Sequence, residues 1–143
     1  MDQRVSLITL AVRDLDASRA FYVEGLGWQP FLDVDDVLMI PVGEHLLLSL
    51  WHADSFTDEV GEITLGHGIA PITLAHNVRS NAEVDAILHT MEAAGGTVLQ
   101  WGTRRVWGGW SGYAADPDGY RWEIANAGDG PLTDLVVPVK TQP

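Results

Sequence analysis

Ile8-Thr9-Leu10-Ala11, near the start of the chain, recurs as Ile72-Thr73-Leu74-Ala75, and this repeated stretch decides the fold prediction. Each copy leads into a polar turn, then a helical pattern, then several short strands. The second copy begins near the middle of the 143 residues, so two copies and a tail fill the chain. We therefore predict a tandem duplication whose working surface lies where the copies face each other.

The composition is that of a folded protein. Hydrophobic residues make up 46% and charged residues 20% of the chain, which argues against a disordered chain and a membrane protein. No apolar run approaches the roughly 20 residues of a spanning helix, and the N-terminal residues 1–4 do not have the pattern of a signal peptide. The absence of cysteine excludes disulfides, thiolate metal sites and a cysteine nucleophile. We expect a cytoplasmic protein that forms a single domain, residues 1–143.

The formal net charge of −12 argues against nucleic acid as a partner, because the phosphates would be repelled. Two interpretations remain open. The charge either keeps the protein soluble or attracts a cationic ligand into an acidic cleft.

The first repeat, residues 4–51, predicts the order βαβββ. Asp14 is placed to cap a helix that ends at Gly25 and Gly27. Alternating or continuous apolar residues bounded by turn residues predict its strands, at residues 5–12, 28–34, 37–42 and 45–51.

The second repeat, residues 69–127, follows a polar linker, residues 52–68, and predicts the same order. Ser80-Asn81-Ala82-Glu83 has the spacing of a capping box, and the helix that follows ends at Gly95-Gly96. Its strands are predicted at residues 69–76, 97–101, 110–115 and 120–127. The tail, residues 128–143, is polar and then rich in valine, and it could add an edge strand or contact a partner subunit.

The predicted fold class is therefore α+β, with tandem βαβββ modules that form an open, trough-like sheet. In each module the helix covers one face of the sheet, and the other face must be covered or line a cavity.

Two motifs resemble those of a known family. The pattern V-x-D-L-x-x-S-x-x-F-Y fits residues 12–22 (VRDLDASRAFY), and the pattern D-P-D-G-x-x-x-E fits residues 116–123 (DPDGYRWE). Both resemble the vicinal oxygen chelate superfamily, which includes glyoxalase I, extradiol dioxygenases and bleomycin-resistance proteins. The resemblance covers about residues 4–127 and implies the paired βαβββ fold. It also implies a divalent metal in the trough, held by His, Gln or Glu on four strands, and a homodimer.

The four metal positions that the resemblance implies fall on Leu7, Ser49, Pro71 and Glu123. Leucine and proline offer no donor atom, and serine is a poor ligand for these ions. We therefore predict no cofactor and no metal site. A displaced divalent metal held by Glu123 with His52 or His67 remains the less favoured alternative.

Strand alternation predicts which side chains face the trough. In the first module, Thr9 and Ala11 follow Leu7 on one face. The floor is then mostly small or apolar with a few polar groups, which suits an organic ligand. The polar and aromatic ligand-binding residues predicted on this floor are Thr9, Ser49, Trp51, Thr73 and Glu123.

Three tryptophans, Trp101, Trp107 and Trp110, lie in one glycine-rich stretch that also holds Arg104 and Arg105. Their rings offer flat apolar surfaces for stacking and cation–π contacts. We predict that this tryptophan cluster forms a lid over the ligand. Contacts in the core or with a second subunit are the alternative.

Glu123 is the predicted catalytic residue, as a general base or an anchor for the ligand; the alternative is a carboxylate paired with Arg121 or an arginine of the lid. The favoured hypothesis is a bleomycin-resistance-like protein that binds a small aromatic or cationic molecule between the modules without a metal. A lyase, isomerase or dioxygenase that uses a metal or Glu123 is the alternative, and a purely structural or regulatory dimer is the third.

Overall fold

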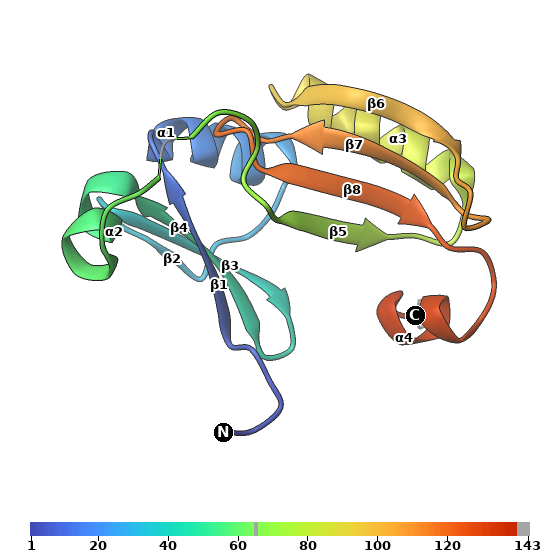
Figure 1. The fold of residues 1–143 in the computed structure, drawn as a ribbon, viewed down its shortest axis with the longest axis horizontal. Coiled ribbons are helices and arrows are strands. Elements are labelled where there is room, and N and C mark those ends of the chain that lie inside the picture. The colour runs from blue at the N-terminus through green and yellow to red at the C-terminus, as the bar shows by residue number, and fades with distance from the viewer. Residues whose placement is uncertain (65, 140–143) are drawn as a thin grey trace. The chain divides into compact units, whose positions relative to one another are not determined.

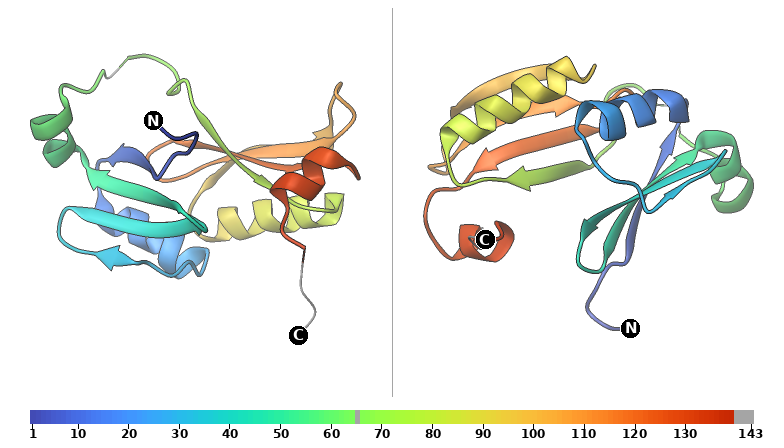
Figure 2. Two further views of the ribbon diagram at one scale, coloured as in Figure 1. Left: turned by 90° about the horizontal axis from the view of Figure 1, so that it is seen from below. Right: turned by 180° about the vertical axis from the view of Figure 1, so that it is seen from behind.

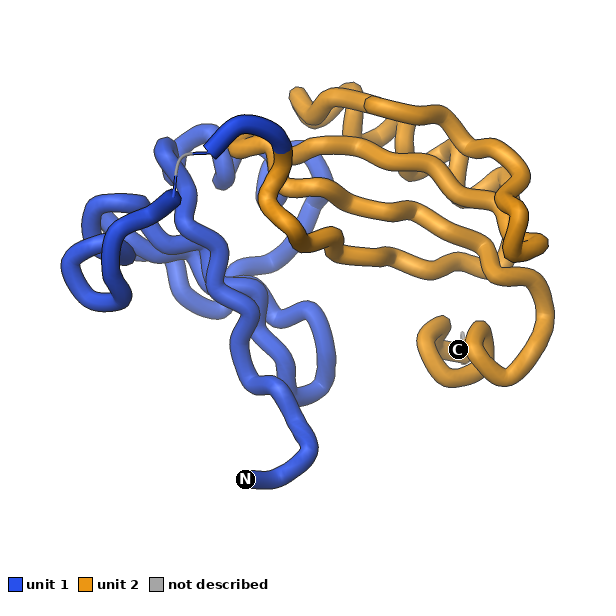
Figure 3. The backbone as a smooth tube through the Cα atoms, in the orientation of Figure 1, with its two compact units in different colours: residues 1–68 blue, residues 69–143 orange. Residues whose placement is uncertain are grey.

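The structure is a computed structural model that describes residues 1–64 and 66–139. The chain divides into two compact units, residues 1–68 and 69–143 (Figure 3). Each unit holds one four-stranded sheet together with helices, as Figure 1 shows. The predicted α+β class, with two related modules, is confirmed.

Unit 1 arranges its strands in the order β1-β4-β3-β2. The first strand runs parallel to the last, whereas the other two pairs are antiparallel. The predicted strand 28–34 shrinks to two residues, and a helix occupies part of the predicted linker. The elements are β1 (Leu7–Val12), α1 (Leu15–Ser18), η1 (Arg19–Gly25), β2 (Leu32–Asp33), β3 (Val37–Gly43), β4 (Leu46–His52) and α2 (Ala53–Val60).

The core of unit 1 lies on one face of its sheet. Alternate residues of β1, β3 and β4 point to the same face, and those on the core side are almost fully buried. Two aromatic residues of η1, Phe21 and Tyr22, add the largest buried side chains. The buried strand residues are Leu10, Val12, Leu38, Ile40, Leu48 and Leu50.

The segment η1 is a π-helix that continues directly from α1. The Leu26 N–H donates to the Phe21 carbonyl at 2.9 Å, five residues back, and the Trp28 N–H donates to the Tyr22 carbonyl at 3.0 Å. Phe21 and Tyr22 meet edge to face with ring centroids 4.8 Å apart. The wider helical turn thus holds two neighbouring aromatic rings in the core.

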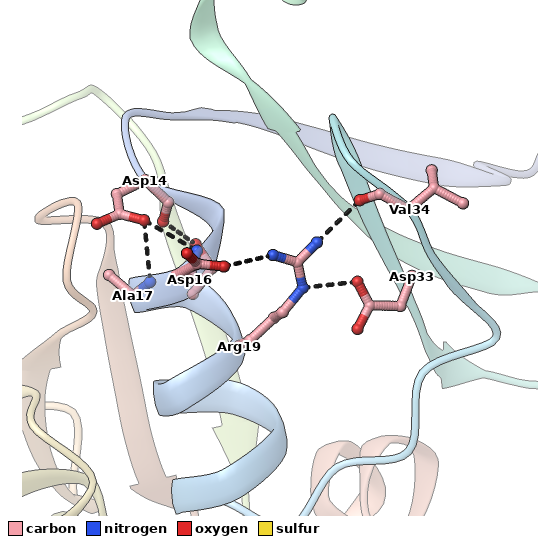
Figure 4. Close-up of polar contacts among 7 residues, drawn as sticks. Asp14, Asp16, Ala17, Arg19, Asp33 and Val34 are labelled. Carbon is pink, nitrogen blue, oxygen red and sulfur yellow. Dashed lines mark hydrogen bonds and ion pairs between the residues drawn. The ribbon is translucent and has the colours of Figure 1, made fainter.

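Arg19 ties the start of η1 to the end of β2 (Figure 4). Its Nε donates to Asp33 at 2.6 Å, its Nη1 donates to Asp16 at 2.7 Å, and its Nη2 donates to the Val34 carbonyl at 2.8 Å. The hydrogen bond to Asp33 is the main reason why the pKa of the Arg19 guanidinium is raised, and the charges of both carboxylates add to it. These side chains are partly solvated, so the cluster positions the loop more than it stabilises the fold.

Asp14 caps α1 as predicted, because its Oδ1 accepts from the backbone N–H of Asp16 at 2.9 Å and of Ala17 at 3.2 Å. Replacing Asp14 by alanine leaves both N–H groups without this acceptor. We expect the free energy of unfolding to fall by about 1 kcal/mol, measured by urea denaturation. Asp14→Asn keeps an acceptor oxygen and is the control; an equal loss in both variants would contradict the capping role.

Unit 2 repeats the arrangement with the order β5-β8-β7-β6, and again the first strand runs parallel to the last. Antiparallel pairing joins the remaining neighbours. Ser80 caps α3 as predicted, since its Oγ accepts from the Glu83 N–H at 3.2 Å, and the same hydroxyl donates to Glu83 Oε2 at 3.0 Å. The elements are β5 (Thr73–Asn77), α3 (Asn81–Ala93), β6 (Thr97–Arg104), β7 (Trp110–Ala115), β8 (Arg121–Asn126) and α4 (Pro131–Val136).

Helix α3 covers one face of this sheet, in contact with β6, β7 and β8, as the rear view in Figure 2 shows. Its apolar stripe, Val84, Leu88 and Met91, is buried as the helical spacing predicts. Trp122 and Ile124 meet this stripe from β8 and are also buried. The opposite face of the sheet, which carries Glu123, is called the open face of unit 2 below.

The tail does not add the edge strand that its valines suggested. It forms α4 instead, since Pro131 sits in the first turn, where a missing N–H costs nothing. The Thr133 hydroxyl donates to the Gly128 carbonyl, and the Val137 N–H closes the last turn on the Thr133 carbonyl at 2.9 Å. Residues 140–143 of the predicted tail lie outside the described residues. Across the described part of the chain, no helix is both long and apolar enough to cross a membrane.

Candidate functional site

The predicted ligand-binding residues of unit 1 lie side by side on one sheet face. Ser49 of β4 pairs in register with Thr9 of β1 on one side and with Met39 of β3 on the other, so the three side chains share one face. Ser49 is only 2% exposed, so its hydroxyl is closed off by its neighbours. The shared face that strand alternation predicted for these residues is confirmed, although their role in binding stays a prediction.

Trp51 occupies the end of the same face of β4. Its indole N–H donates to Asp36 at 3.3 Å, and its ring meets Phe56 of α2 edge to face, with centroids 5.8 Å apart. The ring is therefore held in place by partners of unit 1. This arrangement presents a fixed aromatic surface.

The open face of unit 2 carries Glu123. Its register partners are Ala75 on β5 and Tyr113 on β7. Thr73 pairs with Arg121 at the start of the same strands, and its hydroxyl donates to the Arg121 carbonyl at 3.3 Å. Thr73 and Glu123 thus share a face, as predicted.

Tyr113 is the hydrogen-bond partner of Glu123. The phenol donates to Glu123 Oε1 at 3.0 Å, and the Arg105 guanidinium lies over the tyrosine ring, 5.4 Å from its centroid. The alternative was that Glu123 pairs with Arg121 or an arginine of the lid; the structure instead pairs Glu123 with this phenol, and Arg121 Nη1 donates to the Gly119 carbonyl at 2.9 Å. The Glu123 carboxylate of β8, the Tyr113 phenol of β7 and the Arg105 guanidinium in the turn after β6 are therefore neighbours in that order.

Burial raises the pKa of the Tyr113 phenol above its ordinary value, and the hydrogen bond to Glu123 and the charge of that carboxylate raise it further. The positive charge of Arg105 acts in the opposite direction. The phenol therefore stays protonated near neutral pH. It can donate one hydrogen bond while Glu123 keeps further acceptor positions.

Tyr113 was missed in the sequence, although a signal for it was present. The Asp116-Pro117-Asp118-Gly119 segment forms the predicted turn, in which Asp116 Oδ1 accepts from the N–H groups of Asp118 at 3.0 Å and Tyr120 at 2.9 Å. Counting outward from that turn along an antiparallel pair places Tyr113 opposite Glu123.

The tryptophan cluster is not gathered over the open face. Trp110 donates from its indole N–H to Asp85 of α3 at 3.3 Å, and the Trp101 ring contacts the His89 ring of α3 in a tilted arrangement, with centroids 4.5 Å apart. Both rings therefore lie on the α3 side of the sheet, opposite Glu123. Trp107 stands in the turn between β6 and β7 and is 53% exposed. The predicted lid is wrong for Trp101 and Trp110, because their strand positions turn them toward α3.

The chain matches the model of the Glyoxalase/Bleomycin resistance protein/Dioxygenase superfamily over residues 4–124. It belongs to this superfamily. No curated protein matches the chain. A glyoxalase-related enzyme from Fulvimarina pelagi is 37% identical in a solved structure, with 87% of this chain and 88% of that chain covered and a TM-score of 0.79.

More distant structures of the superfamily share the fold. A lactoylglutathione lyase from Agrobacterium tumefaciens is 24% identical, with a TM-score of 0.65 and coverage of 87% of this chain and 94% of that one. A superfamily protein from Nocardioides is 21% identical, with a TM-score of 0.76 and coverage of 92% and 87%. At these identities the likeness concerns the fold alone.

The metal that the superfamily resemblance implies does not fit the residues at its four positions. Leu7 and Pro71 have no donor atom, and the Ser49 hydroxyl is buried between its strand neighbours. Glu123 is engaged with Tyr113. In residues 1–64 and 66–139, no three His, Asp or Glu side chains come together in a way that could hold a metal ion.

The histidines that could hold a displaced metal contact other groups or lie on other surfaces of the protein. His52 Nδ1 accepts from the Asp54 N–H at 3.3 Å at the start of α2. His76 is the register partner of Ile124 and so points away from the open face, as predicted. His89 is exposed on α3, also as predicted, and stacks on Trp101. His67 precedes unit 2 and is exposed.

Tyr113 provides a direct test of this site. In Glu123→Gln the carboxylate charge is lost, so we expect the phenol pKa to fall, whereas in Arg105→Gln it should rise. The raised pKa contributes stability at pH values below the ordinary tyrosine pKa of 10.0, and this stability is lost as the pH rises through the higher pKa of the folded state. NMR titration of 13Cζ-labelled tyrosine measures both shifts. Shifts in the same direction in both variants would disprove the arrangement.

Proposed function

We propose that this protein binds a small aromatic or cationic organic molecule without the superfamily's metal, and that Glu123 anchors it. The observation that carries the proposal is the half-buried carboxylate of Glu123 on the open face of unit 2, oriented by the Tyr113 phenol at 3.0 Å. A carboxylate that is partly removed from water and fixed in direction binds an ammonium group better than a mobile surface carboxylate does. The net charge of −12 adds long-range attraction for a cation.

The surroundings of Glu123 suit an organic ligand. Ala75 beside it is small and exposed, which allows close approach to the sheet, and the Tyr113 ring adds apolar surface on the other side. Thr73 offers a hydroxyl two residues along β5. Polar groups that converge beside the apolar surface of a ring are typical of small-molecule sites. Trp107, in the exposed turn between β6 and β7, remains a predicted contact of this ligand.

Calorimetric titration with benzylamine tests the proposal. We expect saturable binding by the natural protein and a loss of about tenfold in affinity in Glu123→Gln, since a charge-assisted hydrogen bond is removed. Glu92→Gln, which removes an equal charge from the exposed surface of α3, is the matched control and should bind normally. Equal affinities in all three proteins would disprove the role of Glu123.

A catalytic role is the second candidate, favoured by the 37% identity to a structure described as a glyoxalase-related enzyme. Glu123 would then act as a general base that removes a proton from the bound molecule, with Tyr113 holding its carboxylate in place. Exchange of a carbon-bound hydrogen of a bound ligand with D2O, followed by NMR, tests this role. Exchange that persists unchanged in Glu123→Gln would exclude it.

We also propose that the protein is a cytoplasmic homodimer. Exposed apolar side chains support association, including Val5 and Leu7 in unit 1 and Leu135 in unit 2, which are 64%, 44% and 83% exposed. Light scattering coupled to gel filtration should give twice the monomer mass of 15.6 kDa. A monomeric mass at micromolar concentration would contradict the proposal.

A further inference from the structure

Two arginines of unit 2, Arg105 and Arg121, differ from most others in this acidic chain. Arg4, Arg19 and Arg79 each form an ion pair with an aspartate. Within residues 1–64 and 66–139, Arg105 and Arg121 are half-buried without such a carboxylate partner, and Arg105 is the one that lies over the ring of Tyr113, the hydrogen-bond partner of Glu123. A partly desolvated cation without a counter-ion is costly unless something compensates for it.

Neutral groups hold the Arg105 guanidinium in one orientation. Its Nε donates to Ser111 Oγ at 2.8 Å, and its Nη2 donates to Gln100 Oε1 at 3.0 Å and to the Ser111 carbonyl at 2.9 Å. The Cζ of Arg105 lies over the Tyr113 ring, 5.4 Å from its centroid. These three hydrogen bonds use Nε and Nη2, so they leave the two N–H groups of Nη1 available to a ligand. The side chain is therefore preorganised with donors to spare.

The position of Arg105 relative to Glu123 is set by β7. Arg105 is anchored at Ser111, whereas Glu123 is anchored at Tyr113, two residues further along the same face of the same strand. Two residues of an antiparallel strand span about 7 Å. A cation and an anion are thus anchored at residues two apart on one face of β7, a spacing that a small molecule with a charged group at each end can bridge.

We propose that the ligand carries two polar ends. Glu123 binds the ammonium or hydroxyl group at one end, and Arg105 binds a carboxylate at the other end. This inference rests on the proposed function and narrows the ligand to a small organic acid that carries an ammonium or hydroxyl group at its other end. Guanidinium groups favour carboxylates because their planar donors match the two oxygens. The fixed orientation lowers the entropy lost on binding.

Three probes of similar size test the inference by calorimetry at low ionic strength, where screening is weak. Benzylamine carries the cation alone, benzoate carries the carboxylate alone, and 4-(aminomethyl)benzoate carries both at opposite ends of one ring. We expect 4-(aminomethyl)benzoate to bind about tenfold more tightly than benzylamine, since it adds one charge-assisted contact. In Arg105→Gln this advantage should disappear, while benzylamine still binds at least as tightly as it does to the natural protein.

Arg104→Gln is the matched control, because Arg104 is exposed and its strand position pairs it with Trp110 on the α3 side. This variant removes the same charge and should keep the advantage of 4-(aminomethyl)benzoate. Arg105→Lys keeps the positive charge but lacks the planar guanidinium, so it should keep only part of the affinity advantage of 4-(aminomethyl)benzoate over benzylamine. Far-ultraviolet circular dichroism establishes that each variant is folded.

The two proposals fail in different ways. If benzylamine binds through Glu123 but Arg105→Gln leaves the affinity for 4-(aminomethyl)benzoate unchanged, the inference about Arg105 is wrong and the proposed function stands. If none of the three probes binds, both are wrong. As an independent readout, saturation with 4-(aminomethyl)benzoate should leave the pKa of Tyr113 higher than saturation with benzylamine does, since both ligands place an ammonium at Glu123 and only the former adds a carboxylate that offsets the charge of Arg105.

Discussion

Replacing Phe21 by alanine is expected to lower the free energy of unfolding of unit 1 by about 3–5 kcal/mol, the usual loss for a fully buried phenylalanine. Phe21 is 0% exposed and packs edge to face on Tyr22, which leans in turn on Trp28 with ring centroids 5.5 Å apart. The truncation removes both the buried area and the support of this aromatic stack. Urea denaturation followed by circular dichroism measures the loss.

Phe31→Ala is the matched control for this prediction. Phe31 lies in the same unit but is 72% exposed, so the same truncation should change the free energy of unfolding by less than about 0.5 kcal/mol. A loss of the same size in both variants would show that the stack in η1 is not what stabilises unit 1.

Replacing Gly112 by alanine is expected to destabilise unit 2 by about 1–3 kcal/mol or more, because the added methyl group has no space. A Cβ at this position would lie 2.5 Å from Leu88 Cδ1 and 2.7 Å from the carbonyl oxygen of Gln100. The leucine side chain can move, but the backbone oxygen belongs to the neighbouring strand. Relief would therefore require β6 and β7 to separate. The midpoint of urea denaturation measures the effect.

Gly43→Ala provides the comparison, since Gly43 also lies in a strand and its Cβ would be in ordinary contact, 3.4 Å from Leu46 Cβ. The double variant Gly112→Ala/Leu88→Ala gives a second check. If the close approach of β6 matters more than Leu88, adding Gly112→Ala to Leu88→Ala should cost as much free energy of unfolding as adding it to the natural protein.

The order of elements could be predicted from the sequence because local chemistry specifies it. Asp14 and Ser80 are strong helix caps, and the turn at Asp116 to Gly119 determines how β7 and β8 pair. The residues at which strands begin and end were less predictable. Strand β5 begins at Thr73 rather than at residue 69, and Pro71, which has no N–H for a ladder, lies in the segment that stays outside it.

The site was predictable only where strands are regular. Alternation placed Thr73 and Glu123 correctly because β5 and β8 pair without interruption. Strand β6 has two register shifts, between Val98 and Gln100 and between Gln100 and Thr103. Each shift breaks the alternation of faces, so the direction of Trp101 could not be derived by counting. Arg105 was assigned to the lid, and its contacts with Gln100, Ser111 and Tyr113 could not be predicted because these partners come from three different positions around the turn.

The strand order has a consequence for how the chain is made. In both sheets the last strand synthesised, β4 or β8, sits between the first strand and the other two. The first strand of each sheet pairs only with the last strand, so neither sheet can be completed until the ribosome has released that last strand. Until then β1 or β5 has no partner strand in its sheet. Pairings between distant parts of a chain form slowly. The leading half can nevertheless complete its sheet once His52 has emerged, before most of the trailing half exists.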